Sequence, residues 1–384
     1  MRDPQSCDLE RFVGLEHIDP ESLRIKRWGL IADGTSFTRK FTAGQVLFGK
    51  RRAYQRKVAV ADFDGLCSSD ILVFEPADDQ LLPELLPFIV QTEGFFQHAL
   101  GTSAGSLSPR TRWRDLAAYE FPLPPLDEQR RIAEILWATE EIKAKYVELL
   151  RATQVFRQVL LDKIIPDPEN QTGSEHVIVL ADVCWMQNGR GFPSEDYQDN
   201  GIKLLRPGNL GKDGNFCWDD DATRCLPNVY RELASAYLVN SGDVVINLTA
   251  QSLEEGFMGR VCLAREGDFS LLNQRIGRFY CNDGLLPEYL YRCLQTSRFR
   301  KTVETNCEGS KVKHLYWRHI SSFVLILPST VEQGKILKVL RAAQEATDRV
   351  ERSVVSSLRV SISLREYLLH GIAIARRRGR SNAG

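Results

Sequence analysis

A short segment rich in arginine and lysine is the first part of this 384-residue sequence whose side chains could carry recognition chemistry. The segment reads GKRRAYQRK over residues 49–57 and follows an apolar run typical of a strand. Arginine and lysine donate hydrogen bonds to phosphates and to guanine, whereas glutamine and asparagine match adenine. The candidate nucleic-acid-binding residues here are Lys50, Arg51, Arg52, Tyr54, Gln55, Arg56 and Lys57.

A second polar segment occupies the corresponding place later in the chain, with different chemistry. Residues 247–260 read NLTAQSLEEGFMGR, which is longer and far less basic. Its candidate base-reading residues are Asn247, Thr249, Gln251, Ser252 and Arg260. The contrast suits two surfaces that read different sequences. Ordinary variable surface loops are the alternative interpretation.

Two further loops follow the Gly-Ser pairs at residues 105–106 and 309–310. Basic side chains in them could hold phosphates. The candidates are Arg110 and Arg112 in the first loop and Lys311, Lys313 and His314 in the second. Trp113 and Trp317 come next, and their apolar neighbours predict that both rings lie in a core.

The overall composition adds little to these local signals. Lysine plus arginine equals aspartate plus glutamate, so the net charge of zero does not indicate a polyanionic partner. Nine cysteines are scattered without a Cys-x-x-Cys pair, which predicts reduced thiols, no metal and no cofactor. The sequence has no apolar run of membrane-spanning length and no signal-like N-terminus, so we expect a cytosolic protein.

An internal duplication organises the chain. Shifting the sequence by 204 residues aligns residues 82–136 with 286–340 without a gap. Of the 55 aligned positions, 17 are identical, whereas average composition would give roughly three. The pairs include Trp113 with Trp317 and Gln129 with Gln333.

Each copy predicts a globular α+β module followed by a long helix. Short runs such as GDVVINL and QRIGRFY indicate strands, whereas residues 82–99 and 286–303 have helical spacing. The first module has no counterpart of residues 177 to about 200, so we expect it to be N-terminally shortened. The expected segments are a first module at 1–122, a first spacer helix at 123–165, a linker at 166–176, a second module at 177–326, a second spacer helix at 327–372 and a basic tail at 373–384.

The first expected helix carries a heptad pattern. Apolar or small residues alternate at spacings of four and three, which predicts a long helix–helix seam. The seam comprises Ile135, Thr139, Ile142, Tyr146, Leu149, Thr153, Phe156 and Leu160. The second helix repeats the stripe more weakly, with Ser357 and Ser361 interrupting it. Because only a short linker joins the first helix to the second module, we expect the helices to pair as an antiparallel coiled coil with pseudo-twofold symmetry.

The start of each helix is a proline-containing joint. Pro124 and Pro125 keep the approach extended, and the acids of LDEQ can cap the first helix. The second joint, LPSTVEQ, keeps fewer prolines. Capping and contact with a partner protein are both open as roles for Glu128 and Gln129.

The joint LPLPPLDEQ followed by RRIAEIL resembles the start of the central helix in specificity (S) subunits of Type I restriction-modification systems. The order of module, helix, module and helix is similar to that family's two target-recognition domains and two spacer helices. The resemblance implies a non-catalytic subunit that binds a split target in double-stranded DNA, docks two methyltransferase (M) subunits and, through them, restriction (R) subunits. It implies partner contacts at Pro124, Pro125, Glu128, Gln129, Pro328, Glu332 and Gln333.

Two other function classes fit less well. The sequence contains no phosphate-binding loop, no methyltransferase motif and no clustered acid-acid-Lys nuclease motif, which disfavours an enzyme. A scaffold that joins proteins through two modules on a coiled coil is compatible with the net charge. The basic segment at residues 49–57 argues against that scaffold.

Overall fold

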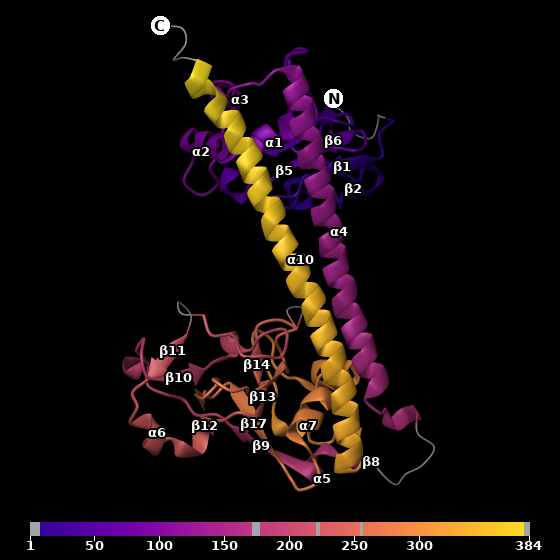
Figure 1. The fold of residues 1–384 in the computed structure, drawn as a ribbon, viewed down its shortest axis with the longest axis vertical. Coiled ribbons are helices and arrows are strands. Elements are labelled where there is room, and N and C mark those ends of the chain that lie inside the picture. Colours follow the sequence, from indigo (N-terminus) through magenta and orange to yellow (C-terminus); the bar gives the residue numbers. More distant parts are fainter. Residues whose placement is uncertain (1–7, 171–176, 220–222, 254–255, 380–384) are drawn as a thin grey trace. The chain divides into compact units, whose positions relative to one another are not determined.

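The computed structural model describes residues 8–170, 177–219, 223–253 and 256–379, with only the backbone described over 369–379. The chain divides into two compact units, Met1–Leu149 with Ser353–Gly384 and Leu150–Arg352. Each unit combines short strands with helices (Figure 1). The expected linker residues 171–176 and the end of the basic tail, 380–384, lie outside the described residues, whereas 373–379 are helical.

Seven strands of the first unit form two sheets. A four-stranded sheet has the order β2-β1-β6-β3, in which β1 and β6 are parallel. A three-stranded antiparallel sheet has the order β5-β4-β7. The strands are β1 (Arg11–Val13), β2 (Gly29–Leu30), β3 (Arg39–Phe41), β4 (Val46–Gly49), β5 (Val58–Val60), β6 (Gly65–Cys67) and β7 (Ile71–Phe74).

The second unit repeats these sheets and extends one of them. Its sheets have the orders β11-β10-β16-β12 and β15-β13-β17-β9, with two-stranded pairs β14-β18 and β19-β8. The strands are β8 (Val177–Val179), β9 (Cys184–Asn188), β10 (Ile202–Leu205), β11 (Arg224–Leu226), β12 (Leu238–Val239), β13 (Val244–Asn247), β14 (Thr249–Ala250), β15 (Val261–Leu263), β16 (Ser270–Leu272), β17 (Ile276–Cys281), β18 (Lys313–His314) and β19 (Val324–Ile326).

Matching registers relate the two sets of strands. Gly49 pairs with Ile71 across β4 and β7, as Asn247 pairs with Ile276 across β13 and β17. The difference is β9, which pairs with β17 in the second unit. Within the described part of the first unit, β7 has β4 as its single strand neighbour. This sheet of the second unit therefore has one strand, β9, that has no counterpart among the described residues of the first unit.

Short helices cover these sheets. The first unit has α1 (Leu86–Val90), α2 (Glu93–Gly101) and α3 (Trp113–Leu116), and the second has α5 (Leu180–Val183), α6 (Tyr230–Leu233), α7 (Pro287–Cys293), α8 (Ser297–Asn306) and α9 (Trp317–Ile320). Each expected helical segment is divided in two at a Gln-Thr pair. Thr92 and Thr296 cap the second helix of each pair by accepting a hydrogen bond from Phe95 N and Phe299 N. A threonine side chain at this position satisfies an otherwise unpaired backbone N–H.

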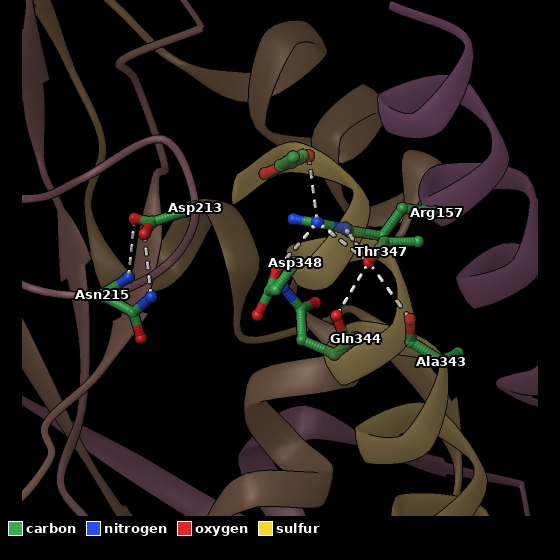
Figure 2. A network of polar contacts seen from close by, with 8 residues as sticks. Arg157, Asp213, Asn215, Ala343, Gln344, Thr347 and Asp348 are labelled. Carbon is green, nitrogen blue, oxygen red and sulfur yellow. Dashed lines mark hydrogen bonds and ion pairs between the residues drawn. The ribbon is translucent and has the colours of Figure 1, made fainter. Parts of the chain in front are cut away.

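Two long helices contribute to both units: α4 (Leu126–Ile164) and α10 (Thr330–Gly379) (Figure 1). In the second unit, Arg157 of α4 donates to Thr347 Oγ1 at 2.9 Å and to the Asp348 carboxylate at 3.0 Å. Figure 2 shows this side chain directed from one helix to the other. In the first unit, Arg365 of α10 pairs with Glu140 of α4 at 3.4 Å.

The heptad seam expected from the sequence is only half buried. Thr139 and Thr153 of α4 are buried, as are Leu340, Thr347 and Val354 of α10. At the alternate positions of the α4 seam, Ile142, Leu149 and Phe156 are 44%, 43% and 56% exposed, and Ile135 is half-buried. Of the two seam positions in each heptad of α4, the one occupied by Thr139 and Thr153 is therefore covered, and the one occupied by Ile142, Leu149 and Phe156 faces outward.

Candidate nucleic-acid interface

The structure brings the two predicted loops of the first unit together. Arg51, which follows β4, forms a β-bridge with Arg110 from the Gly-Ser loop. The backbone N–H groups of Arg52 and Thr111 donate to Pro109 O and Lys50 O at 2.8 and 3.1 Å. These bonds form a short ribbon, residues 50–52 with 109–111, which we call the first ribbon. Two segments separated by more than 50 residues thus present their arginines from one backbone frame.

Asp70, at the start of β7, organises the arginines of the first ribbon. Its carboxylate accepts from Arg110 Nε at 2.8 Å and from Arg51 Nη1 at 3.4 Å. Arg51 also donates to Ser108 Oγ at 3.1 Å. The hydrogen bond from Arg110, together with the positive charges of both arginines, lowers the pKa of Asp70 despite its partial burial. Asp70 is therefore ionised at neutral pH and holds both guanidinium groups in place.

Backbone strain is concentrated in the same loop. Arg52 has φ 55° and Arg56 has φ 52°, and these residues flank the short 3-10 helix Ala53–Gln55. Residues other than glycine rarely adopt this left-handed conformation, which costs on the order of 1–2 kcal/mol. Such strain persists only where surrounding contacts hold it, and it gathers at functional sites. The loop is therefore a strained segment on a rigid sheet.

We expect this strain to invert the usual order of glycine and alanine at position 52. Arg52→Gly should be more stable than Arg52→Ala by about 1 kcal/mol in denaturant unfolding, because both remove the side chain and only glycine accepts positive φ freely. The matched pair Arg51→Gly and Arg51→Ala should show the ordinary preference for alanine. An alanine variant at position 52 as stable as the glycine variant would contradict the strain.

Two predicted residues of the first loop are engaged within the protein. Lys57 Nζ donates to Leu15 O at 2.6 Å. Arg56 is paired with the carboxylate of Glu93 and lies 4.9 Å from the centre of the Phe96 ring. We therefore correct their assignment to the binding surface. Tyr54 is 56% exposed and Arg112 is exposed, whereas Lys50 and Gln55 are half-buried.

The second unit builds an equivalent ribbon. Thr249 of β14 pairs with His314 of β18, and Ala250 pairs with Lys313. Leu315 N donates to Leu248 O at 2.9 Å, as Thr111 N does to Lys50 O. These segments, residues 248–250 with 313–315, form the second ribbon. Gln251 and Lys311 are exposed beside it, and Ser252 is half-buried.

Two predicted residues of the second loop are structural. Asn247 is fully buried, and its Nδ2 donates to Thr249 O and Phe257 O, each at 2.8 Å. Arg260 Nη1 donates to Leu210 O at 2.8 Å, and its guanidinium lies 4.5 Å from the centre of the Phe257 ring. Both therefore shape the loop from inside, which corrects their assignment to base reading.

The two joints use one buried glutamine in the same way. Gln129 Oε1 accepts from Leu82 N at 2.9 Å, and its Nε2 donates to Gln80 O and Pro124 O. Gln333 Oε1 accepts from Leu286 N at 2.9 Å, and its Nε2 donates to Gly284 O and Pro328 O. They are 1% and 0% exposed. Each fastens a helix to its own unit, so neither is available to a partner protein.

The other joint residues have mixed environments. Pro124 is buried and Pro328 half-buried, whereas Pro125 and Glu128 are exposed. Glu332 is exposed and caps α10, because its carboxylate accepts from Ser329 N at 3.0 Å. The burial of Pro124 corrects its assignment as a partner contact, whereas Glu332 caps α10 with a side chain that is still exposed. Pro125 and Glu128 remain accessible.

The aligned tryptophans differ in exposure. Trp317 is half-buried and packs against the core of the second unit. Trp113 is 59% exposed, although its ring centre lies 5.5 Å from that of Phe74. The expectation of a core position is therefore wrong for Trp113. The one-turn helix α3 lies at the surface and leaves one face of the ring uncovered.

Asp70 is the organising residue that sequence reasoning missed. It is a lone acid at the end of a turn, and its only sequence signal is its position directly before a predicted strand. Among the described residues, no cluster of three metal-ligating side chains occurs. Burial raises the pKa of the thiols of Cys67, Cys184 and Cys262 to about 12. In the described ranges, no helix is long and apolar enough to cross a membrane.

Two α+β units that share one backbone frame, and that carry different polar side chains on matching ribbons, define a tandem recognition protein. Residues 31–149 and 175–353 match the model of the Type I restriction modification DNA specificity domain family. These ranges cover most of the chain. The protein belongs to this family.

Similar proteins agree with this assignment. The specificity subunit of the Type I restriction enzyme MjaVIII from Methanocaldococcus jannaschii is 22% identical over 342 residues, covering 82% of this chain and 75% of that protein. The EcoDI specificity subunit from Escherichia coli is 29% identical over 139 residues, covering 35% of this chain and 31% of that protein.

Solved structures share the fold. A chain from a structure describing complex assembly of the type I R-M system has a TM-score of 0.64 at 19% identity, covering 97% of this chain and 93% of that one. The S subunit of a Type-I restriction-modification system from M. genitalium has a TM-score of 0.52 at 14% identity, covering 94% and 92%.

Proposed function

We propose that this chain is the non-catalytic specificity subunit of a Type I restriction-modification complex. It binds a bipartite target in double-stranded DNA and directs methyltransferase and restriction subunits to that target. The observation that carries the proposal is the pair of ribbons, in which equivalent backbone positions hold arginines in one unit and threonine and histidine in the other. Two readers with one frame and different side chains suit two different half-sites. The names of the curated relatives support the same role.

The two target-recognition domains of the proposal are residues 1–122 and 177–326, each followed by its spacer helix. The DNA-facing residues that stay accessible in the first domain are Lys50, Arg51, Arg52, Tyr54, Gln55, Arg110 and Arg112, and in the second Thr249, Gln251, Ser252, Lys311, Lys313 and His314. Their cations supply affinity through phosphates, while the ribbon side chains supply discrimination between bases.

In this proposal α4 and α10 pair as an antiparallel coiled coil with pseudo-twofold symmetry. The support is that equivalent pairs recur: Arg157 with Asp348 in one unit and Arg365 with Glu140 in the other. Both arginines and both acids are related by an offset of 208 residues, four more than the offset of 204 that aligns the starts of the two helices. Buried threonines recur at the same offset, at 139 and 347.

The methyltransferase subunits dock on the outward-facing half of the heptad pattern. Phe156 of α4 and Leu364 of α10 are related by the helix offset and are 56% and 42% exposed. Pro125 and Glu128 extend the accessible surface at the first joint. Exposed apolar side chains at regular spacing on a helix are typical of a surface that a partner covers.

Replacing Phe156 with serine should weaken binding of the methyltransferase subunit about tenfold, because a large aromatic contact is lost. The unfolding free energy should change by less than about 0.5 kcal/mol, since the ring is mostly exposed. Val155→Ser, on the neighbouring face, is the matched control. Isothermal titration of both variants against the methyltransferase subunit checks this, and equal losses in the two would contradict the assigned face.

The experiment that tests the proposed function is a titration of labelled duplexes with the complete complex at several salt concentrations. We expect affinity to fall steeply with salt and one split sequence to be preferred over random duplex. Salt-dependent binding without preference among sequences would exclude the specificity role. No binding to DNA at all would favour a scaffold that joins proteins.

A further inference from the structure

One position at the base of each ribbon is occupied by oppositely charged residues in an otherwise identical frame. Lys50 N donates to Asp70 O at 3.0 Å in the first unit, and Leu248 N donates to Arg275 O at 2.9 Å in the second. The next residue pairs in register, since Gly49 lies opposite Ile71 and Asn247 opposite Ile276. Asp70 and Arg275 are therefore structural equivalents.

The turn before this position is also the same in both units. Ile71 N donates to Ser68 O at 3.0 Å, and Ile276 N donates to Asn273 O at 2.9 Å. Four independent relations, namely the strand register, the turn, the bond to the ribbon and the bridge across the ribbon, thus agree. Each recognition site consists of three positions: 51, 70 and 110 in the first unit, and 249, 275 and 314 in the second.

The side chains at these three positions differ in a systematic way. The first unit has arginine, aspartate and arginine, with the carboxylate between the two guanidinium groups. The second has threonine, arginine and histidine, and Arg275 is exposed. Within the described residues, no side-chain partner of the Arg275 guanidinium is found. The cation lies on the outer positions in one unit and on the central position in the other.

We propose that the central position, Asp70 and Arg275, determines which bases each unit reads. This inference rests on the proposed function and names residues of the same recognition surface. Asp70 is a positioning residue: it fixes Arg51 and Arg110 so that their remaining N–H groups point at guanine edges or phosphates. Arg275 acts directly, because a free guanidinium can form the bidentate contact that selects guanine.

Geometry explains why the roles differ. Asp70 has 16% of its side chain exposed, so it reaches the arginines better than it reaches a base. An ionised carboxylate facing a phosphate-rich groove is tolerated only when neighbouring cations compensate its charge. Neither threonine nor histidine carries a negative charge, so Thr249 and His314 cannot hold the Arg275 guanidinium as Asp70 holds the arginines of the first unit.

The test selects from a duplex library randomised in two separated segments, using the full chain assembled with its methyltransferase subunits. Asp70→Asn should lower the preference for the favoured base at one or more positions of a single half-site by roughly tenfold. Arg275→Gln should do the same in the other half-site only. In each case the undisturbed half-site serves as the internal control, with a change below about twofold.

Conservative variants separate positioning from folding. Asp70→Glu keeps the negative charge and should restore most of the base preference lost in Asp70→Asn. Asp62→Asn removes the charge of an exposed acid in the same unit and should leave both half-sites unchanged. If Asp70→Asn fails to fold, Arg275→Lys decides, because its ammonium keeps the charge but cannot form the bidentate contact and should lower selectivity in its own half-site only.

Three outcomes are distinguishable. A wild-type complex that enriches no sequence would overturn the proposed function itself. A wild-type complex that enriches a split target, while every variant at 70 and 275 enriches it with the same profile, would overturn this inference alone. Loss of selectivity in both half-sites from either change would also overturn it, because the position would then act through the whole protein.

Discussion

Replacing Gln333 with methionine is expected to lower the free energy of unfolding of the second unit by about 3 kcal/mol. The methionine side chain fills the same volume, but Leu286 N, Gly284 O and Pro328 O all lose their partner. Each buried backbone group left without a hydrogen bond costs roughly 1–3 kcal/mol. Glutamine suits this position because its amide supplies one acceptor and two donors. Unfolding in denaturant measures this decrease in the free energy of unfolding, and scanning calorimetry gives an independent value.

The first unit offers both a repeat of this experiment and its control. Gln129→Met should destabilise by a similar amount, since Gln129 makes the same three bonds. Gln97→Met changes an exposed amide that bonds to the Glu93 side chain, and it should cost less than about 0.5 kcal/mol. Limited proteolysis should also cut the first joint, at residues 121–126, faster in Gln129→Met than in the unmodified protein. If Gln129→Met were as stable as the control Gln97→Met, the buried amide of Gln129 would not be what holds the joint together.

Removing both arginines of the first ribbon is expected to weaken DNA binding about 100-fold at moderate salt. Arg51→Ala with Arg110→Ala removes two cations and leaves the Asp70 carboxylate without the partners that lower its pKa. The ordinary pKa of an aspartate, about 3.9, lies far below neutral pH, so we expect the carboxylate to keep its charge and to repel phosphate. The slope of log affinity against log salt should become shallower by about two, since each phosphate contact contributes roughly 0.9.

A pair of arginines away from the ribbon tests whether charge alone explains this result. Arg130 and Arg131 are exposed on the second turn of α4, in the same unit. Their double alanine variant removes the same net charge and should change DNA affinity less than about threefold. Filter binding or anisotropy across a salt series compares the two. Matching losses would mean that the ribbon has no special role and that the unit attracts DNA through its overall charge.

The joints illustrate what sequence patterns predict well. The prolines, the acids of the first turn and the amphipathic run that follows predict a helix from about residue 123, and α4 begins at Leu126. Helix capping and apolar periodicity depend on residues that are neighbours in the chain, so the sequence alone can predict them. The sequence could not predict the structural role of Gln129, because two of its three hydrogen-bond partners are backbone groups nearly 50 residues away.

Residues that were expected to be buried but are exposed show a second limit of prediction from sequence. Ile142 and Leu149 have the spacing of a buried stripe, yet both are more than 40% exposed. Heptad spacing predicts that residues lie on one face of a helix, whereas their burial depends on what packs against that face. Trp113 aligns with half-buried Trp317 and is nevertheless exposed, since the short helix that carries it ends at the surface.

By itself, the sequence determined the duplication and the mixed helix and sheet content of both copies, because repeats and periodicities depend on residues close together in the chain. It also predicted where the joints lie and which loops we propose to meet DNA. Only the tertiary structure decided which polar side chains remain for recognition. Lys57 and Gln333 donate to backbone groups more than 40 residues away, and Asn247 donates to the backbone of its own loop. Asp70 instead lies between Arg51 and Arg110. Hydrogen-bond satisfaction is set by strand register, and no local pattern encodes it.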